Sequence, residues 1–148
     1  MLGALTPAQI EEVLKKEVVA RIGCYANGRP YVVPITYTYD GESVIGHSAH
    51  GMKIDMMRRN PNVCVEVDHV DDLANWRSVI AWGKYEELSG EAAFDAIEAL
   101  VKRLEPLTVS QTSIPTLHHA RPHGREPLAE GVVVYRIRLT EKTGRFER

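Results

Sequence analysis

The pattern of apolar and polar positions predicts mainly strands along the first half of the chain. Residues 18–26 are apolar and β-branched and end at Asn27-Gly28, a dipeptide typical of a type I′ hairpin turn because both positions tolerate positive φ. A returning strand is expected over 29–39. Asp40-Gly41 predicts a second turn of the same kind, before a strand over 42–48. Two successive tight hairpins predict an antiparallel meander.

Three further strands are expected in the second half. Apolar and polar residues alternate over 63–70, as in a half-buried strand, and 76–88 and 132–139 are also strand-like. Gly83 inside the long strand predicts a bulge or a close approach of backbone. Pro34 removes one ladder donor from its strand, so it is expected at an edge, at a bulge or beside something other than a strand.

Helical spacing of apolar residues appears in three places. A helix is expected to begin at Thr6-Pro7, which can supply a cap and a first-turn proline, and to end near Glu17. A short helix over 54–59 is stopped by Asn60-Pro61, and a longer one covers 91–104. The tail over 140–148 is polar and is expected to be extended.

These elements predict the fold class. The 148 residues fit a single domain over 1–148 that is mainly β (α+β), with six antiparallel strands and flanking helices. Six twisted strands are expected to close into a small barrel because closure removes exposed edges. The strands do not alternate with helices, so a Rossmann fold is not expected.

Composition narrows the function classes. A net charge of −2 argues against a partner such as nucleic acid or an anionic membrane, and no apolar run reaches the roughly 20 residues of a membrane span. The N-terminus shows no secretory pattern, so a cytoplasmic protein is expected. Cys24 and Cys64 lie in apolar strands, where buried reduced thiols are expected, with a disulfide as the alternative. Such burial also disfavours a catalytic cysteine.

The segment from Gly46 to Lys53 carries the candidate chemistry. A hydroxyl (Ser48), two imidazoles (His47 and His50), a glycine and a lysine lie where a strand leads into a helix N-terminus. Free backbone N–H groups and the helix dipole favour an anion at such a place, typically a phosphate. Lys53 adds a full positive charge to the first turn. A solvated lysine in a loop is the alternative interpretation.

Two neighbouring walls suit a flat heteroaromatic ring. Residues 33–36 offer apolar side chains together with backbone N–H and C=O groups, and Ser78 and Val79 offer a second apolar wall with one polar contact. A metal is the competing interpretation, since the 105–131 loop carries His118, His119 and His123. No paired-cysteine spacing or His-Glu-x-x-His helix supports it, so no metal site is predicted.

The chain resembles the pyridoxamine 5′-phosphate oxidase-like, FMN-binding split-barrel family, and within it the nitroimidazole-resistance (Nim) type. The resemblance extends from about residue 18 to 138. The segments that carry the resemblance are 28–37, Asp40-Gly41, 47–53, 59–63 and 76–83. Each segment is weak evidence alone, and their order and spacing together make the resemblance specific.

The resemblance implies an FMN site and a split β-barrel. The cofactor-binding residues that it implies are Val33, Pro34, Ile35, Thr36, His47, Ser48, Met52, Lys53, Ser78 and Val79. Lys53 would pair with the phosphate, and residues 33–36 would line the flavin ring largely through backbone. Members of the family are homodimers with sites at the subunit interface, so some contacts are expected from a second chain.

The resemblance also implies redox chemistry. The leading hypothesis is an FMN-dependent oxidoreductase acting on a small electron-poor acceptor such as a nitroaromatic, with His47 or His50 as a catalytic proton donor. The alternatives are a non-catalytic flavin or haem binding protein and a deazaflavin-dependent reductase. Met52 stands where the oxidases carry an arginine, and residues 144–148 lack their arginine-rich motif, so oxidation of vitamin B6 is not expected.

Overall fold

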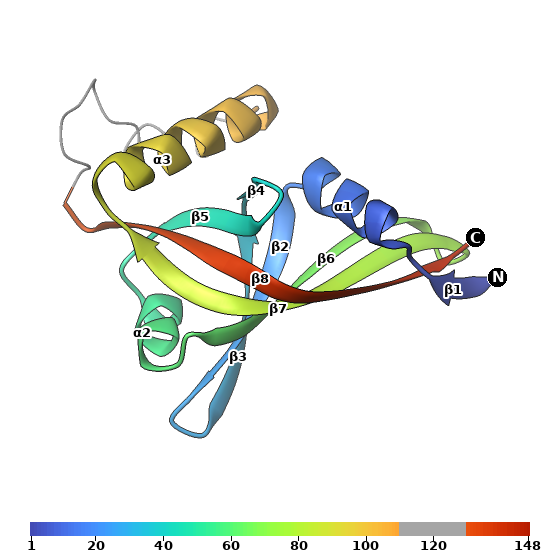
Figure 1. The fold of residues 1–148 in the computed structure, drawn as a ribbon, viewed down its shortest axis with the longest axis horizontal. Coiled ribbons are helices and arrows are strands. Elements are labelled where there is room, and N and C mark those ends of the chain that lie inside the picture. The colour runs from blue at the N-terminus through green and yellow to red at the C-terminus, as the bar shows by residue number, and fades with distance from the viewer. Residues whose placement is uncertain (110–129) are drawn as a thin grey trace.

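The computed structural model describes residues 1–109 and 130–148, and within them eight strands form one antiparallel sheet (Figure 1). The strands are β1 (Leu2–Ala4), β2 (Val19–Ala26), β3 (Arg29–Thr36), β4 (Thr38–Tyr39), β5 (Ser43–Ala49), β6 (Asn62–Asp72), β7 (Asn75–Leu88) and β8 (Val132–Glu147). Their order in the sheet is β3-β2-β6-β7-β8-β5-β4, and β1 pairs with β8.

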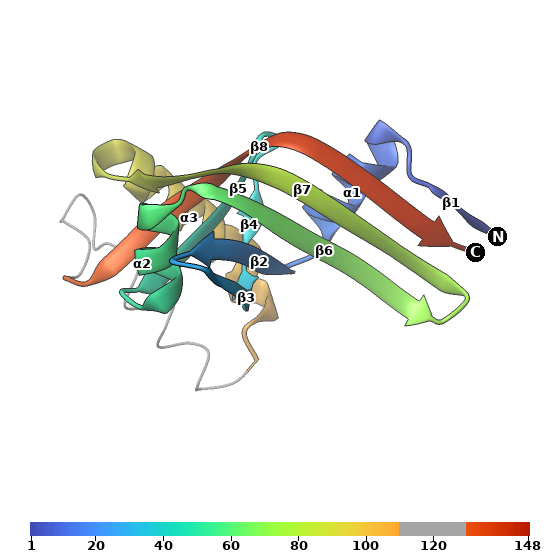
Figure 2. The same cartoon turned by 90° about the horizontal axis from the view of Figure 1, so that it is seen from below.

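The sheet curls without closing. Strands β3 and β4 lie at the two ends of the ladder and do not pair with each other (Figure 2). The expected class, a mainly β (α+β) split barrel with flanking helices, is confirmed, while full closure of the ladder is not found.

The expected count of six strands was too low. The strand expected over 29–39 divides at Tyr37, whose fully buried side chain donates a hydrogen bond to the carbonyl oxygen of Leu14 at 2.7 Å. The N–H of Tyr37 donates to the carbonyl oxygen of Val18 at 3.0 Å, one position beyond the paired Thr36 and Val19, so the hydrogen bonding between β2 and β3 continues to the residue that separates β3 from β4. The short strand β1 was not expected. The polar tail beyond residue 139 is extended, as expected, and belongs to strand β8, because it pairs with β7 and β1.

The helices lie close to where they were expected. Helix α1 (Pro7–Lys16) begins with a capping box, in which the side chains of Thr6 and Gln9 bond to each other's backbone N–H. Helix α2 covers Met52–Arg59 and α3 covers Gly90–Leu104, followed by the 3₁₀ turn η1 (Glu105–Leu107). None of the helices in the described residues is long and apolar enough to span a membrane.

Apolar side chains pack on both sides of the curled sheet. The larger cluster fills the inside of the curl, where α1 and α2 contribute Leu14, Ile54 and Met57. The second cluster lies on the outside, beneath α3. Because neighbouring residues of a strand point to opposite faces, Val44 belongs to the inner cluster and Ile45 to the outer one.

The two predicted turns differ from each other. Asn27 and Gly28 have φ values of 52° and 75°, as a type I′ turn requires. The Asp40-Gly41 turn was wrongly expected to be of this kind. Four residues separate the paired Tyr39 and Val44, and the carboxylate of Asp40 accepts bonds from the N–H groups of Glu42 and Ser43, two and three positions later. Asp40 thus forms an Asx turn.

The long β7–β8 ladder contains the predicted irregularity. The register shifts between Trp82 and Gly83, and a Cβ on Gly83 would lie 2.3 Å from the carbonyl oxygen of Arg138. Gly83 is therefore required by close approach of backbone. Both cysteines are free thiols; Cys24 is buried and Cys64 half-buried. Burial, followed by the neighbouring Cys64, raises the pKa of the Cys24 thiol, which fits the inert role expected for it.

Candidate functional site

The turn between β5 and α2 has the predicted form of a strand leading into a helix N-terminus. Gly51 is the N-cap residue, and no side chain bonds to the first amides of the helix. The N–H of Asp55 donates to the carbonyl oxygen of Gly51 at 3.1 Å, so the ladder of helical bonds starts there. The amides of Met52, Lys53 and Ile54 precede that bond and are not capped by a side chain. The turn therefore presents backbone donors of the kind that bind anions.

Lys53 lies half-buried in this first turn. Burial lowers the pKa of its ammonium group, and no carboxylate pairs with it in residues 1–109 and 130–148. A lysine withdrawn from water normally has an ion-pair partner. The structure thus places an unpaired cation beside uncapped amides, and this arrangement favours an anion from outside the described chain.

His47 and Ser48 point to opposite faces of β5. His47 lies on the same face as Ile45 and pairs across the ladder with Val134, beneath α3. Burial, and secondarily the charge of Lys53, lowers the pKa of His47, so the neutral imidazole is favoured. Ser48 lies on the inner face, and its hydroxyl donates to the carbonyl oxygen of Ala49. The two adjacent residues therefore serve different sides of the strand.

His50 is engaged by the helix that follows it. Its Nε2 lies 2.6 Å from Oδ1 of Asp55, and both side chains are exposed. The hydrogen bond with His50 is the largest cause that lowers the pKa of the Asp55 carboxyl. This contact fixes the loop to the first turn of α2, so the structure gives His50 a structural partner in addition to its predicted role.

The residues predicted on β3 divide between the two faces. Ile35 is buried in the inner cluster with Val33 packed against it, whereas Pro34 and Thr36 are exposed. Since β3 pairs only with β2, the other side of its backbone has no strand partner in the described residues. Pro34 therefore lies in an edge strand, one of the positions expected for it. A ligand at this edge would meet backbone groups more than side chains.

The adjacent residues Ser78 and Val79 also point to opposite faces of the sheet. Val79 is fully buried in the inner cluster, and Ser78 faces outward and donates a hydrogen bond to Glu66 at 3.0 Å. Arg21 on β2 lies 3.1 Å from Asp68 and 3.7 Å from Glu66, which completes a polar cluster on the outer face. Desolvation is the largest cause that raises the pKa of Glu66 in this cluster.

The distance across the sheet limits which of the predicted residues a single bound ligand can contact. Strands β2 and β6 lie between β3 and β7 in the sheet. At about 4.8 Å per strand spacing, the β3 edge and Ser78 are roughly 14 Å apart across the sheet. Ser78 is therefore separated from the β3 edge within one sheet.

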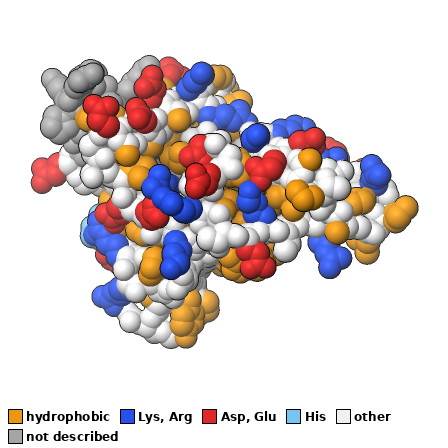
Figure 3. Space-filling view, viewed as in Figure 1, with side chains coloured by type: hydrophobic (Ala, Val, Ile, Leu, Met, Phe, Trp, Pro, Cys, Tyr) orange, Lys and Arg blue, Asp and Glu red, His pale blue; other side chains and the backbone are white. Residues whose placement is uncertain are grey.

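The outer face also holds an apolar surface that the sequence analysis did not identify. Its large side chains are partly exposed, with Val32 68%, Tyr25 53%, Ile80 42% and Trp82 41% accessible. A shallow groove of about 570 Å³ runs across it, between Trp82, Cys64 and Val32. Figure 3 shows hydrophobic side chains gathered at the tip of the β2–β3 hairpin, which carries Tyr25 and Val32. In the sequence, this surface could have been predicted from Ile80 and Trp82, which are apolar and alternate along β7 with the buried Val79 and Ala81.

Neither of the hollows found in the described residues coincides with the predicted ligands. The outer groove includes none of the residues predicted to bind the cofactor. A smaller hollow of about 180 Å³ lies at the other end of the sheet, between His69, Trp76 and Phe146. The predicted ligands therefore line neither of these two hollows. The loop histidines His118, His119 and His123 lie outside the described residues, and no group of three potential metal ligands occurs within them.

Comparison with known families identifies the chain. A family model described as pyridoxamine 5′-phosphate oxidase matches residues 6–146. The chain belongs to this family. A region of 70 residues is 40% identical to an uncharacterized protein of Rhizobium meliloti and spans about half of each, 47% of this chain and 46% of that relative.

Solved structures agree with the fold of this pyridoxamine 5′-phosphate oxidase family member. An FAD-binding protein from Mesorhizobium loti is 29% identical with a TM-score of 0.74, and the match covers 100% of this chain and 99% of that one. A candidate 5-nitroimidazole antibiotic resistance protein from Bacteroides thetaiotaomicron is 22% identical with a TM-score of 0.72, covering 99% and 87%. The second likeness supports the fold alone.

Proposed function

We propose that the protein binds FMN at the β5–α2 turn and is an oxidoreductase for a small electron-poor acceptor, such as a nitroaromatic. The observation that carries the proposal is the half-buried Lys53 with no carboxylate partner in the described residues, next to the uncapped amides of α2. A phosphate supplies the negative charge and the acceptor oxygens that this turn lacks. When bound, the flavin would supply the redox chemistry.

The chain itself supplies binding and shielding. Lys53 and the first amides of α2 would hold the phosphate, and the free backbone edge of β3 beside Pro34 would meet the rim of the ring. The similarity to a protein described as FAD-binding supports a flavin, and the resemblance of the sequence segments to the nitroimidazole-resistance type suggests the acceptor class. His47, kept neutral by burial, would accept a proton near the turn rather than donate one as first expected.

A homodimer completes the proposed site. The partly exposed Ile80 and Trp82 lie on the outer face with the Arg21–Glu66–Ser78 cluster. An apolar surface of this kind, interrupted by a satisfied polar cluster, fits an interface between two copies. In such a dimer the partner would bring its outer face to the turn and the β3 edge, and would thereby cover a ring that one open sheet cannot enclose. Two free thiols fit a reducing, cytoplasmic compartment.

The experiment that tests the proposal identifies the ligand directly. The native protein is purified without added cofactor, its absorbance spectrum is recorded, and the released ligand is identified by mass. Flavin absorbance with FMN as the released species supports the proposal, and FMN-dependent reduction of a nitroaromatic tests the reaction. If the released ligand is FAD, the proposed cofactor FMN is wrong. A Soret band would favour the haem-binding alternative. A colourless protein that binds only a deazaflavin would favour the deazaflavin-dependent reductase.

A further inference from the structure

Helix α2, which carries Lys53, depends on contacts with the rest of the protein for its position. It has eight residues and no side-chain N-cap bond. An isolated helix shorter than about 12 residues is marginal in water, so its own hydrogen bonds do not hold it in place. Its buried residues Ile54, Met56 and Met57 fix the side that faces the core. Contacts of its polar side chains must fix the remaining rotation and tilt.

One carboxylate connects the last turn of α2 to the sheet. Arg58 donates from Nε to Oε1 of Glu87 and from Nη2 to Oε2 at 3.2 Å, a two-pronged ion pair with the C-terminal end of β7. Glu87 also accepts a hydrogen bond at 2.9 Å from the hydroxyl of Tyr85. The hydrogen bond from Arg58 is the largest cause that lowers the pKa of Glu87. Glu87 thus accepts three bonds in a fixed arrangement.

This carboxylate is itself held by the core. Tyr85 is 7% exposed, and its ring lies 5.5 Å from the ring of the fully buried Tyr135. The connection therefore runs from the packed interior through Tyr85 and Glu87 to Arg58. Lys53 lies five residues before Arg58, which corresponds to about 7.5 Å along a helix axis. A helix this short moves as one body. A displacement of its last turn therefore also displaces its first turn, which carries Lys53.

We propose that Glu87 is a positioning residue for Lys53. By holding Arg58 it fixes α2, and so it sets where the ammonium group and the first helical amides meet the phosphate. This inference rests on the proposed function of the turn. It gives Glu87, which is not among the predicted ligands, a role in selecting a phosphorylated flavin over one without a phosphate.

The test compares two ligands in the full chain. Glu87→Gln removes the charge and keeps the size of the side chain, and dissociation constants are measured for FMN and for riboflavin, which lacks the phosphate. We expect FMN binding to weaken about three- to tenfold, a part of what a charge-assisted contact contributes, and riboflavin binding to stay the same. The matched control is Glu86→Gln, the same change one position earlier, where the carboxylate binds Arg136 and Arg138 instead.

A purely structural role gives a different result. Equal weakening for both ligands, or a lower melting temperature with an unchanged preference for FMN, overturns the inference. If Glu87→Gln does not fold, Tyr85→Phe removes only the hydroxyl bond, and a smaller loss specific to FMN is expected. The exchange Arg58→Glu with Glu87→Arg restores the pair and should recover FMN binding. If the unaltered protein does not prefer FMN to riboflavin, the proposed phosphate site fails first and this inference fails with it.

Discussion

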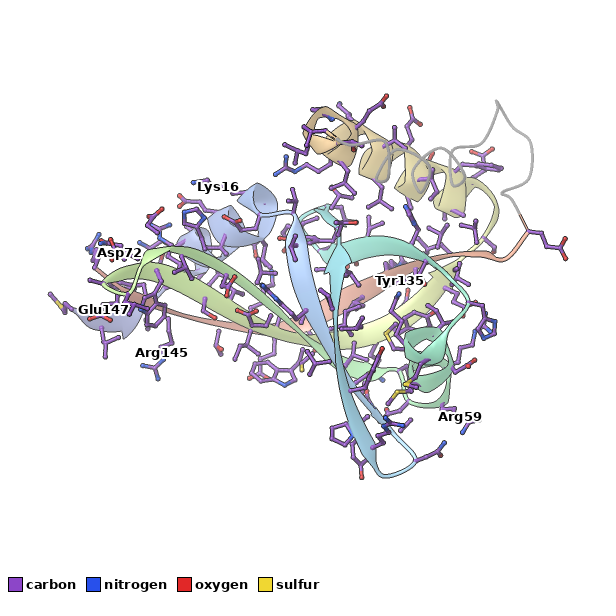
Figure 4. All side chains as sticks on the ribbon, turned by 180° about the vertical axis from the view of Figure 1, so that it is seen from behind. Lys16, Arg59, Asp72, Tyr135, Arg145 and Glu147 are labelled. Atoms are coloured by element: carbon purple, nitrogen blue, oxygen red, sulfur yellow. The ribbon has the colours of Figure 1, made fainter. Side chains whose placement is uncertain are left out.

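The hydroxyl of Tyr135 lies over the α-carbon of Gly46, its partner on the adjacent strand β5. A Cβ on Gly46 would lie 2.7 Å from that oxygen. Tyr135, labelled in Figure 4, is fully buried within the curl of the sheet, and its hydroxyl has no hydrogen-bond partner among the described residues. Burial raises the pKa of Tyr135 accordingly. Glycine thus makes room for a ring whose polar end is left unsatisfied.

Tyr135→Phe should leave stability unchanged or raise it by up to about 1 kcal/mol, because it removes a buried hydroxyl without a partner. Tyr37→Phe is the matched control. That hydroxyl is equally buried but donates to Leu14, and its loss should cost about 1–3 kcal/mol because the carbonyl oxygen is left unpaired. Urea unfolding of both variants checks the pair. A clear loss of stability in Tyr135→Phe would mean that the hydroxyl bonds to a buried water.

Gly46→Ala should destabilise the protein by about 1–3 kcal/mol, since the new methyl group must displace the Tyr135 ring. The control is Gly51→Ala, where a Cβ would meet no atom within 4 Å and the backbone is extended. Thermal unfolding of the two variants gives the comparison. Similar melting temperatures for both would contradict the packing described at Gly46.

Lys53→Ala should weaken FMN binding by about 1.5–3 kcal/mol, the scale of a charge-assisted hydrogen bond. The reason is that Lys53, in the first turn of α2, has no carboxylate partner in the described residues. Lys102→Ala on the exposed side of α3 removes an equal charge away from the site and should have little effect. Flavin fluorescence titration measures both affinities. An unchanged affinity in Lys53→Ala would remove this residue from the phosphate site.

His47 should make the stability of the protein depend on pH. Its pKa is lowered in the folded state from the ordinary value of 6.5, so the unfolded chain binds the proton first as the pH falls. The free energy of unfolding should therefore decrease as the pH drops below 6.5, until the lowered pKa of the folded state is passed. His47→Gln should flatten this part of the profile. Parallel profiles for the two proteins, from urea unfolding at several pH values, would contradict the assignment.

Ile80→Glu should convert the proposed dimer to a monomer, because it places a charge in the apolar outer face. Leu107→Glu also replaces an exposed apolar residue, 52% accessible, but Leu107 lies on η1 and does not line the outer groove, so this change should leave the assembly intact. Light scattering after size exclusion gives the mass of each variant. A native protein that is already monomeric at micromolar concentration would overturn the proposed interface.

Local signals in the sequence were sufficient for most of the fold. The Asn27-Gly28 turn, the capping box at Thr6 and the glycine at position 83 each depend on a few neighbouring residues, and all three were predicted correctly. The break at Tyr37 could not be predicted in the same way. The hydroxyl of Tyr37 bonds to Leu14, which is distant in the sequence, and no local pattern marks the residue at which the strand divides.

In the candidate site, too, local features could be predicted from the sequence and contacts between distant residues could not. The β5–α2 turn and its uncapped amides follow from a strand that ends where a helix begins. Strand alternation already implied that His47 and Ser48 point apart, but only the sheet order separates Ser78 from the β3 edge. The contact between Arg58 and Glu87 joins residues 29 positions apart, and no local pattern marks it.

Strand β8 has a consequence for how the protein is made. It is the last strand of the chain, yet it pairs with β7, β5 and β1, and its end lies beside Leu2 (Figure 1). During synthesis the ribosome therefore releases the other strands of the described residues before the one that joins them. Until then the facing edges of β5 and β7 have no partner, and such edges invite pairing between chains. Newly made protein should be most vulnerable to aggregation, and most in need of a chaperone, until β8 has left the ribosome.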